Sequence, residues 1–332
     1  MGLVNPSVVF ADVDKVYEPA PAWLKMLVKT PIRRPIRALQ GVSFEVSPGE
    51  ICAVVGPNGA GKTTLFRILV GLTTPTKGHA TVLGFDAVNQ SLQIRRRVGW
   101  LPTEDASLLQ RLTCADNLRF NGRLKGLSGR SLEIAIHDAL EIVGLQDLAQ
   151  TAVLTLSSGM KARLRLARAI MHKPDVLVLD EPTATVDPVG AYVLLNLIVD
   201  IVRQGDLAAL ISSHRLDEIE ALHSHVVLLN RGHLLYDGDL DDLRRTIDRP
   251  HLELVFGTQQ KVSDAKTYLE NIPSIEVIKT IGSDIHVAVR GGVPVGPVLA
   301  GLGTTLPDLL EIRQVKVPLR DLLAEIYGAA DG

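Results

Sequence analysis

Residues 56–64, with the sequence GPNGAGKTT, constrain this chain more than any other stretch. They match G-x-x-x-x-G-K-[ST], the pattern of a phosphate-binding P-loop. The apolar run 51–55 before them is typical of a strand, and residues 65–70 after them are typical of a helix. Glycines let such a loop turn its amide N–H groups into one concavity, and the start of the helix adds partial positive charge. The residues expected to contact the phosphates of a nucleotide are Gly56, Asn58, Gly59, Ala60, Gly61, Lys62, Thr63 and Thr64.

Side chains in two segments are suited to the chemistry of phosphate transfer. Lys62 can reach the terminal phosphates, and the Thr63 hydroxyl can bind Mg²⁺. Asp180 and Glu181 follow an apolar strand, so Asp180 can hold Mg²⁺ while Glu181 polarises an attacking water. Two acids after a strand can also cap a helix. The P-loop upstream favours the catalytic interpretation.

A second loop of small residues opens a basic helix. Ser157, Ser158 and Gly159 stand at its start, where amide groups can bind an anion or where a serine simply caps the helix. His214 ends another apolar strand and can contact a γ-phosphate, although a single histidine is more often structural. One nucleotide does not need two phosphate cradles in one subunit. The second cradle is therefore expected to serve the nucleotide of a partner.

The composition limits the function classes. The chain has 332 residues, 46% of them hydrophobic, and a formal net charge of -2. This size favours one large domain and one smaller domain, and the balanced charge argues against a nucleic-acid partner. Cys52 and Cys114 are too few for a disulfide framework and indicate a reducing compartment. No run reaches the ~18 apolar residues of a membrane span, so the chain is not expected to cross a membrane by itself.

The order of the predicted elements divides the chain. Up to residue 240, buried strands alternate with helices, which predicts a parallel sheet with helical crossovers. A proline-rich, basic stretch at 18–36 interrupts this part, and residues from about 101 to 171 are mostly helical. Residues 250–332 show the order βαββαβα, which predicts a small α+β domain of ferredoxin-like type.

Taken together, residues 56–64, 156–161 and 175–182, with Asp187 and His214, resemble the nucleotide-binding subunit of an ABC transporter. The resemblance covers residues 7 to 240 and is specific, because the loop at 156–161 marks ABC ATPases among P-loop proteins. It implies a P-loop ABC-type α/β fold with an antiparallel β subdomain and a helical subdomain. The C-terminal part resembles the accessory domain of the bacterial branch that exports drugs, lipids and polysaccharides.

The resemblance also implies roles and partners. Two subunits, either identical or a pair of related ATPases, would enclose two ATP molecules with Mg²⁺. Glu181 would be the catalytic base, His214 the switch residue, Asp187 the aspartate of the cross-dimer loop, and Tyr17 the aromatic that stacks on adenine. The subunit would lie peripherally at the cytoplasmic face of the cell membrane. It would dock on a separate permease through residues 101–148.

Two positions depart from the family pattern. Thr103 stands where a glutamine usually contacts Mg²⁺ and the attacking water, and threonine is too short to reach equally far. The adjacent Glu104 is the candidate to substitute for it. Ser158 replaces the usual glycine of the second loop, which costs some backbone freedom. Activity is nevertheless expected to survive.

Other functions and roles stay open. A soluble ABC ATPase acting on a ribosome or DNA is the alternative, but this chain has one uninterrupted cassette and no heptad run. In the stretch 18–36, Trp23, Leu24, Leu27 and Val28 can share one helical face beside basic residues. That segment either contacts lipid headgroups or the partner, or forms a solvated loop. The cargo cannot be deduced, because cargo contacts lie in the permease.

Overall fold

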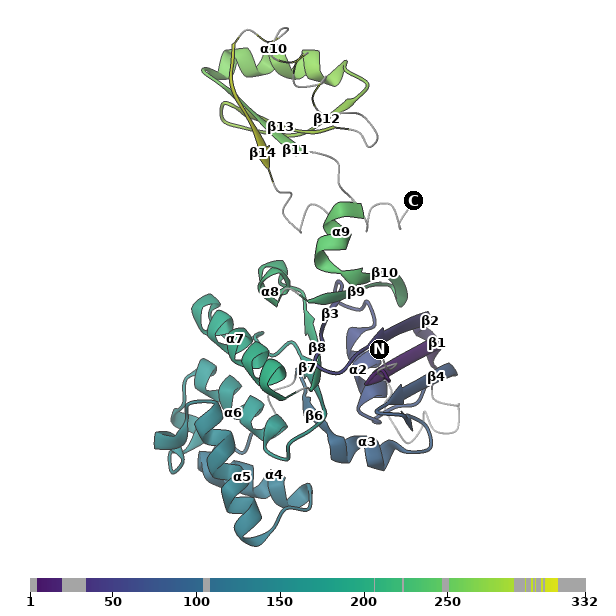
Figure 1. Cartoon of the computed structure of the whole chain (residues 1–332), viewed down its shortest axis with the longest axis vertical. Helices are drawn as coiled ribbons and strands as arrows, with labels where there is room; N and C mark the ends of the chain where they lie inside the picture. The colour runs from purple at the N-terminus through teal and green to yellow at the C-terminus, as the bar shows by residue number, and fades with distance from the viewer. Residues whose placement is uncertain are drawn as a thin grey trace. The chain divides into compact units, whose positions relative to one another are not determined.

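The computed structural model describes residues 5–19, 34–103, 108–205, 207–222, 224–246, 251–289 and 308–315, together with residues 296, 300, 302 and 306. The chain divides into two compact units, Met1–Leu240 and Asp241–Gly332. The larger unit contains two sheets and the smaller unit contains one (Figure 1).

The centre of the larger unit is a six-stranded sheet in the order β10-β9-β3-β8-β7-β6. Five of its strands, β3, β6, β7, β8 and β9, are parallel to one another. The edge strand β10 runs antiparallel to β9. The inner strands β3, β7 and β8 are buried at every position, which explains their continuous apolar runs. The strands are β3 (Ile51–Val55), β6 (Val98–Leu101), β7 (Val176–Asp180), β8 (Ala208–Ser213), β9 (His225–Asn230) and β10 (His233–Asp239).

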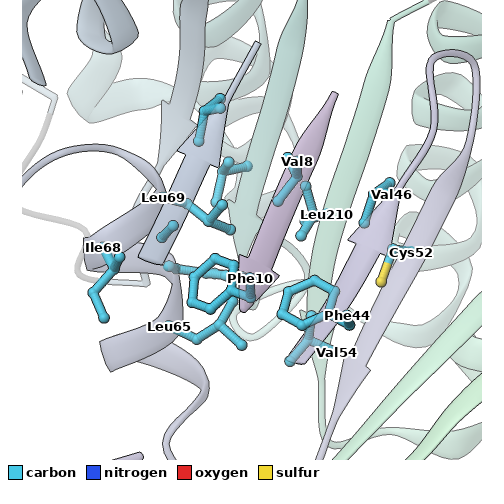
Figure 2. Close-up of a cluster of buried hydrophobic side chains, with 14 of the residues drawn as sticks. Val8, Phe10, Phe44, Val46, Cys52, Val54, Leu65, Ile68, Leu69 and Leu210 are labelled. Carbon is cyan, nitrogen blue, oxygen red and sulfur yellow. The ribbon is translucent and has the colours of Figure 1, made fainter. Parts of the chain in front are cut away.

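A second, antiparallel sheet has the order β2-β1-β4-β5. Its strands are β1 (Val8–Tyr17), β2 (Ile36–Val46), β4 (Lys77–Val82) and β5 (Phe85–Asp86). Helix α2 (Lys62–Leu69) packs its apolar face against this sheet and against the parallel sheet in one core. Phe10 and Phe44 stack there with ring centroids 4.9 Å apart, next to Leu65 (Figure 2). The helix that starts at the P-loop is therefore held between two sheets.

The remaining helices of this unit form a helical region and the cover of the parallel sheet. Helices α4, α5 and α6 pack on one another, α6 contacts β6, and α7 contacts both α6 and α8 (Figure 1). The helices are α3 (Ser91–Arg97), α4 (Cys114–Leu124), α5 (Gly129–Ile142), α6 (Ser158–Ile170), α7 (Pro188–Gly205) and α8 (Leu216–Leu222), with short 3-10 turns η2 (Gln146–Leu148) and η3 (Val153–Thr155). The predicted α/β fold with an antiparallel β part and a helical part is confirmed.

The sequence predicts a short strand at residues 7–10, but β1 is longer. The strand continues beyond Phe10 through a shift of register to Tyr17, which pairs with Ile36 at the start of β2. Asp12 at this irregularity has a φ of 50°. The stretch that follows Tyr17 is thus the connection of a hairpin between β1 and β2. Residues 20–33, including the proposed amphipathic segment, lie outside the described residues.

The smaller unit has an antiparallel sheet in the order β12-β13-β11-β14. Val262, Ala265 and Leu269 of its helix α10 pack onto the buried side chains of this sheet. The strand order is that of a ferredoxin-like fold. Its elements are α9 (Leu240–Thr246), β11 (His251–Phe256), α10 (Gln259–Glu270), β12 (Ile275–Ile281), β13 (Asp284–Val289) and β14 (Leu309–Val315). The predicted order βαββαβα places its last two helices at 297–304 and 319–326. The second of these lies outside the described residues, as does most of the first.

A histidine between two carboxylates joins three strands of the parallel sheet at the end opposite the P-loop. His225, at the start of β9, has Nδ1 2.8 Å from Glu50 Oε1 and Nε2 2.5 Å from Asp237 Oδ1. Burial alone would lower the pKa of His225, but its hydrogen bonds to Glu50 and Asp237 outweigh burial and raise it. Burial would likewise raise the pKa of Glu50, but the hydrogen bond from His225 lowers it.

The stability of the larger unit should therefore depend on the charge of His225. A raised histidine pKa contributes stability that is complete below its ordinary value of 6.5 and is lost as pH rises through the folded pKa. We expect His225→Gln to lower the free energy of unfolding at pH 6 by about 1.5–3 kcal/mol, the scale of a charged hydrogen bond. The same substitution should also reduce the loss of unfolding free energy that occurs as the pH rises above 6.5. Urea unfolding at several pH values measures this, with the exposed His233→Gln as control. An unchanged pH slope in His225→Gln would contradict the prediction.

Candidate functional site

The P-loop has the backbone that its glycines make possible. Gly59 and Gly61 have φ values of 83° and 112°, and Gly61 caps α2. A Cβ at Gly61 would lie 2.5 Å from the carbonyl oxygen of Ala38, so a side chain there would collide with β2. The loop is also held from outside, because the amide of Gly232 donates to the carbonyl of Ala60 at 2.9 Å. Sheet contacts therefore hold the loop in an anion-binding shape at the start of a helix.

The Lys62 side chain lies inside this loop. Its ammonium donates to the carbonyl oxygens of Gly56 at 2.7 Å and Pro57 at 3.2 Å, and the residue is buried. Burial lowers the pKa of Lys62, and the negative charges of Glu181 and Asp180 oppose that shift. The cation thus sits in a low-dielectric site within the field of the two acids at the end of β7. There it would interact strongly with a bound phosphate.

The carboxylate of Asp180 joins the P-loop helix to the central sheet. Thr63 Oγ1 donates to Asp180 Oδ2 at 3.0 Å, and Ser212 Oγ donates to Asp180 Oδ1 at 2.6 Å. The same Ser212 oxygen accepts the backbone N–H of Glu181 at 2.9 Å. Ser212 is completely buried and was not predicted as a site residue. The signal that could have identified it is the parallel pairing of two apolar strands that both end in polar residues.

Glu181 and His214 meet at the carboxyl ends of β7 and β8. His214 Nδ1 lies 3.3 Å from Glu181 Oε1, and the two side chains are 51% and 18% exposed. Glu181 has a φ of 49°, which is unusual for a residue other than glycine and costs on the order of 1–3 kcal/mol. Such strain persists where the surroundings hold it, and here Ser212 accepts the Glu181 amide. The arrangement presents a carboxylate and an imidazole to the same space.

Thr103 reaches this edge of the sheet from the neighbouring strand. Leu101, the last residue of β6, pairs with Leu179 of β7 in parallel register. Thr103 follows two positions later, at the level where Glu181 follows β7, and it is half-buried. Its predicted contact with Mg²⁺ stays a prediction. Glu104 lies outside the described residues.

The second predicted loop lies beside a different part of the chain. Ser157 caps α6 by accepting the amide of Met160 at 3.3 Å, and Ser157 and Ser158 are exposed. A Cβ on Gly159 would lie 3.9 Å from a Val186 methyl, so this loop adjoins the one that ends at Asp187.

Asp187 is exposed and accepts the amide of Gly190 at 3.0 Å. The predicted residues therefore form two groups. One surrounds the P-loop and the other joins Ser157–Gly159 to Asp187.

Tyr17 is the last residue of β1. Its ring is half-buried, and Lys15 Nζ lies 5.0 Å from the ring centroid. Lys15 also donates to the carbonyl of Thr74 at 2.7 Å, which anchors that cation next to the ring. Adenine stacking by Tyr17 stays a prediction.

Comparisons with known proteins identify the family of this chain. Residues 39–184 match the protein family described as "ABC transporter". The chain is 33% identical to the ABC transporter ATP-binding protein NatA of Bacillus subtilis over 224 residues, 68% of this chain and 91% of NatA. It is 36% identical to the Nod factor export ATP-binding protein I of Rhizobium meliloti, over 64% of this chain and 60% of that protein.

A solved structure shares the fold of the larger unit. The dimeric, post-hydrolysis form of the ATP-binding cassette MJ0796, bound to ADP and phosphate, matches 70% of this chain and 98% of its own with a TM-score of 0.60 at 21% identity. The P-loop, the acids that end β7 and the match along almost all of NatA lead to one conclusion: the chain belongs to the family of ABC transporter ATP-binding proteins and is an ATPase of that family.

Proposed function

We propose that this subunit hydrolyses ATP between two copies of the chain, or between this chain and a related ATPase, and powers export through a separate membrane permease. The observation that carries the proposal is the polar chain from Thr63 through Asp180 and Ser212 to Glu181 and His214. It brings a P-loop hydroxyl, two acids and a histidine together at the carboxyl ends of β7 and β8. These are the groups that phosphoryl transfer to water requires.

Within this proposal, each group has a distinct task. The P-loop amides and Lys62 bind the phosphates, Tyr17 stacks on adenine, and Glu181 accepts a proton from the attacking water. His214 contacts the γ-phosphate. The hydroxyl of Thr63 and the carboxylate of Asp180 lie 3.0 Å apart and are oxygen ligands of the kind that Mg²⁺ prefers. These two residues would hold the ion, which would neutralise phosphate charge.

The exposed second loop supports a two-subunit site. Ser157 and Ser158 present a helix start to solvent, next to the exposed Asp187. A helix start favours anions, and this one adjoins Val186 instead of completing the P-loop. A head-to-tail dimer would place it against the nucleotide held by the other subunit.

A surface groove supports the proposed docking on a permease. It has a volume of about 660 Å³ and lies where α3, β6, α4 and α6 meet. Leu72, Leu92 and Leu124 line it and are 57%, 54% and 72% exposed, and Arg95 and Arg96 add positive charge. An apolar groove with basic residues fits a short permease segment with apolar and acidic side chains. Since α4 belongs to the predicted docking region 101–148, the groove extends that prediction to α3 and α6.

Export and location rest on the relatives. One relative is named for export of Nod factor, and transport by such subunits requires a membrane partner. No helix among the described residues is both long and apolar enough to span a membrane. We place the subunit peripherally, at the cytoplasmic face of the membrane that holds the permease.

Replacing Leu124 with aspartate should separate this subunit from its permease. Burying a leucine contributes about 1.5–3 kcal/mol, so a charge there should lower the membrane-bound fraction at least ~tenfold. Leu310→Asp, at a 70% exposed leucine of β14, is the matched control. The full chain is co-expressed with the membrane protein encoded beside it, and membranes are sedimented and immunoblotted. A wild-type chain that stays unbound would reject the transport function. If Leu124→Asp still sediments with the membranes, the groove is not the docking site.

A further inference from the structure

A buried carboxylate holds the loop between β7 and α7. Glu218 of α8 is 3% exposed, and its Oε2 accepts hydrogen bonds from Thr183 Oγ1 at 2.8 Å and from Ser213 Oγ at 2.7 Å. Its Oε1 lies 3.2 Å from a guanidinium nitrogen of Arg215. A buried charge is stable only when it is paired and hydrogen-bonded, and here Oε2 accepts the hydrogen bonds while Oε1 is ion-paired with Arg215. One side chain thereby joins the loop, the end of β8 and α8.

Ser212 and His214, at the end of β8, contact the segment that begins at Asp180. Ser212 bonds to Asp180 and to the amide of Glu181, and His214 lies 3.3 Å from the Glu181 carboxylate. Ser213, between them, donates instead to Glu218, which also accepts from Thr183 of the loop. Glu218 therefore links this strand end to the loop beyond Glu181.

The same loop leads directly to the exposed Asp187. Its turns are short: the amide of Ala184 donates to the carbonyl of Glu181 at 3.2 Å, and the amide of Val186 donates to that of Thr183 at 3.0 Å. Thr183 is 2% exposed, so the loop is anchored at its buried side and open at Asp187. A displacement of Asp187 by a second subunit would pull on Thr183.

We propose that Glu218 is a positioning residue for ATP hydrolysis, which couples the loop that carries Asp187 to the strand end that carries His214. The inference rests on the proposed roles of Glu181 and His214. A shift of the loop moves Thr183, and the hydrogen bond from Thr183 moves Glu218 with it. The hydrogen bond between Glu218 and Ser213 then transmits this shift to Ser213, the neighbour of His214. The contact acts on the geometry of the hydrolytic step and leaves the phosphate-binding P-loop untouched.

Substitutions at Thr183 test this without removing a buried charge. Thr183→Val keeps the shape but loses the hydroxyl that donates to Glu218. We expect kcat to fall about tenfold, which corresponds to roughly 1.4 kcal/mol, while KM for ATP changes less than about twofold. Thr183→Ser restores the hydroxyl and should recover most of kcat. A purely structural role would move the melting temperature without separating kcat from KM in this way.

A double-mutant cycle assigns the effect to the pair. Glu218→Leu, which has no acceptor atom, should lower kcat at least as much as Thr183→Val, and the double variant should be no slower than Glu218→Leu, because the contact that Thr183→Val removes is then already absent. Glu45→Leu, at an exposed position of β2, is the control for replacing a carboxylate with leucine.

Three results would overturn the proposal: wild-type kcat in Thr183→Val, no recovery in Thr183→Ser, or additive single effects. Measuring Glu181→Gln in the same assay distinguishes failure of the proposed catalytic base from failure of the proposed role of Glu218. If Glu181→Gln keeps full turnover, the proposed catalytic base is wrong. If only Glu181→Gln is slow, the base stands and the role of Glu218 is rejected.

Discussion

Replacing Lys62 with alanine is expected to abolish ATP binding, and hydrolysis with it. The ammonium lies in the concavity of the P-loop, buried, and within the field of Asp180 and Glu181. Removing it takes a positive charge away from the phosphates, next to two carboxylates. Removing one partner of a buried charge pair costs about 3–5 kcal/mol, so the affinity should fall by ~10² or more. Isothermal titration with Mg-ATP measures this loss.

Two further variants make the result specific. Lys62→Met keeps the apolar stem of the side chain and removes only the charge, so it should lose ATP as Lys62→Ala does. Lys77→Ala, at an exposed position of β4, should bind ATP normally. Circular dichroism confirms that each variant is folded. Normal affinity in Lys62→Met would mean that the lysine acts through loop packing and not through its charge.

Replacing Glu181 with glutamine is expected to stop turnover and leave ATP binding intact. The amide retains the size of the side chain but cannot accept a proton from water, and loss of a general base costs ~10²–10⁴ in rate. The P-loop and Asp180 are unchanged, so the two-subunit ATP complex should still form. It should then accumulate, because its dissociation depends on hydrolysis. Size-exclusion chromatography with Mg-ATP and a phosphate-release assay give the two readouts.

The controls for this variant concern its neighbours. Glu141→Gln on α5, at a side chain that is 68% exposed, should leave both readouts unchanged. Glu104→Gln tests whether Glu104, the candidate to substitute for the glutamine that Thr103 replaces, takes part in hydrolysis. If Glu181→Gln hydrolyses ATP at the wild-type rate, the base lies elsewhere. If it is inactive but stays monomeric with ATP, the shared-site dimer is wrong.

Local sequence was sufficient for the elements that carry the nucleotide chemistry. The P-loop follows a buried strand and starts α2, and Asp180 ends β7, as the apolar runs predicted. These predictions succeed because short-range rules govern them: glycine permits the positive φ of Gly61, and continuous apolar residues favour a strand buried on both faces. The strand predicted at 7–10 was too short, because Asp12, Asp14 and Lys15 interrupt the apolar run while the pairing with β2 continues.

Contacts between distant residues were decided only by the tertiary structure. Ser212 meets Asp180 because β7 and β8 are neighbours in parallel register, and Glu218 meets Thr183 because α8 packs beside the loop after β7. Neither contact has a sequence period or motif, since strand order depends on how the whole apolar core packs. The sequence by itself therefore determined which chemical groups are candidates for acting on a phosphate. Only the fold decided which buried side chains hold those groups in place.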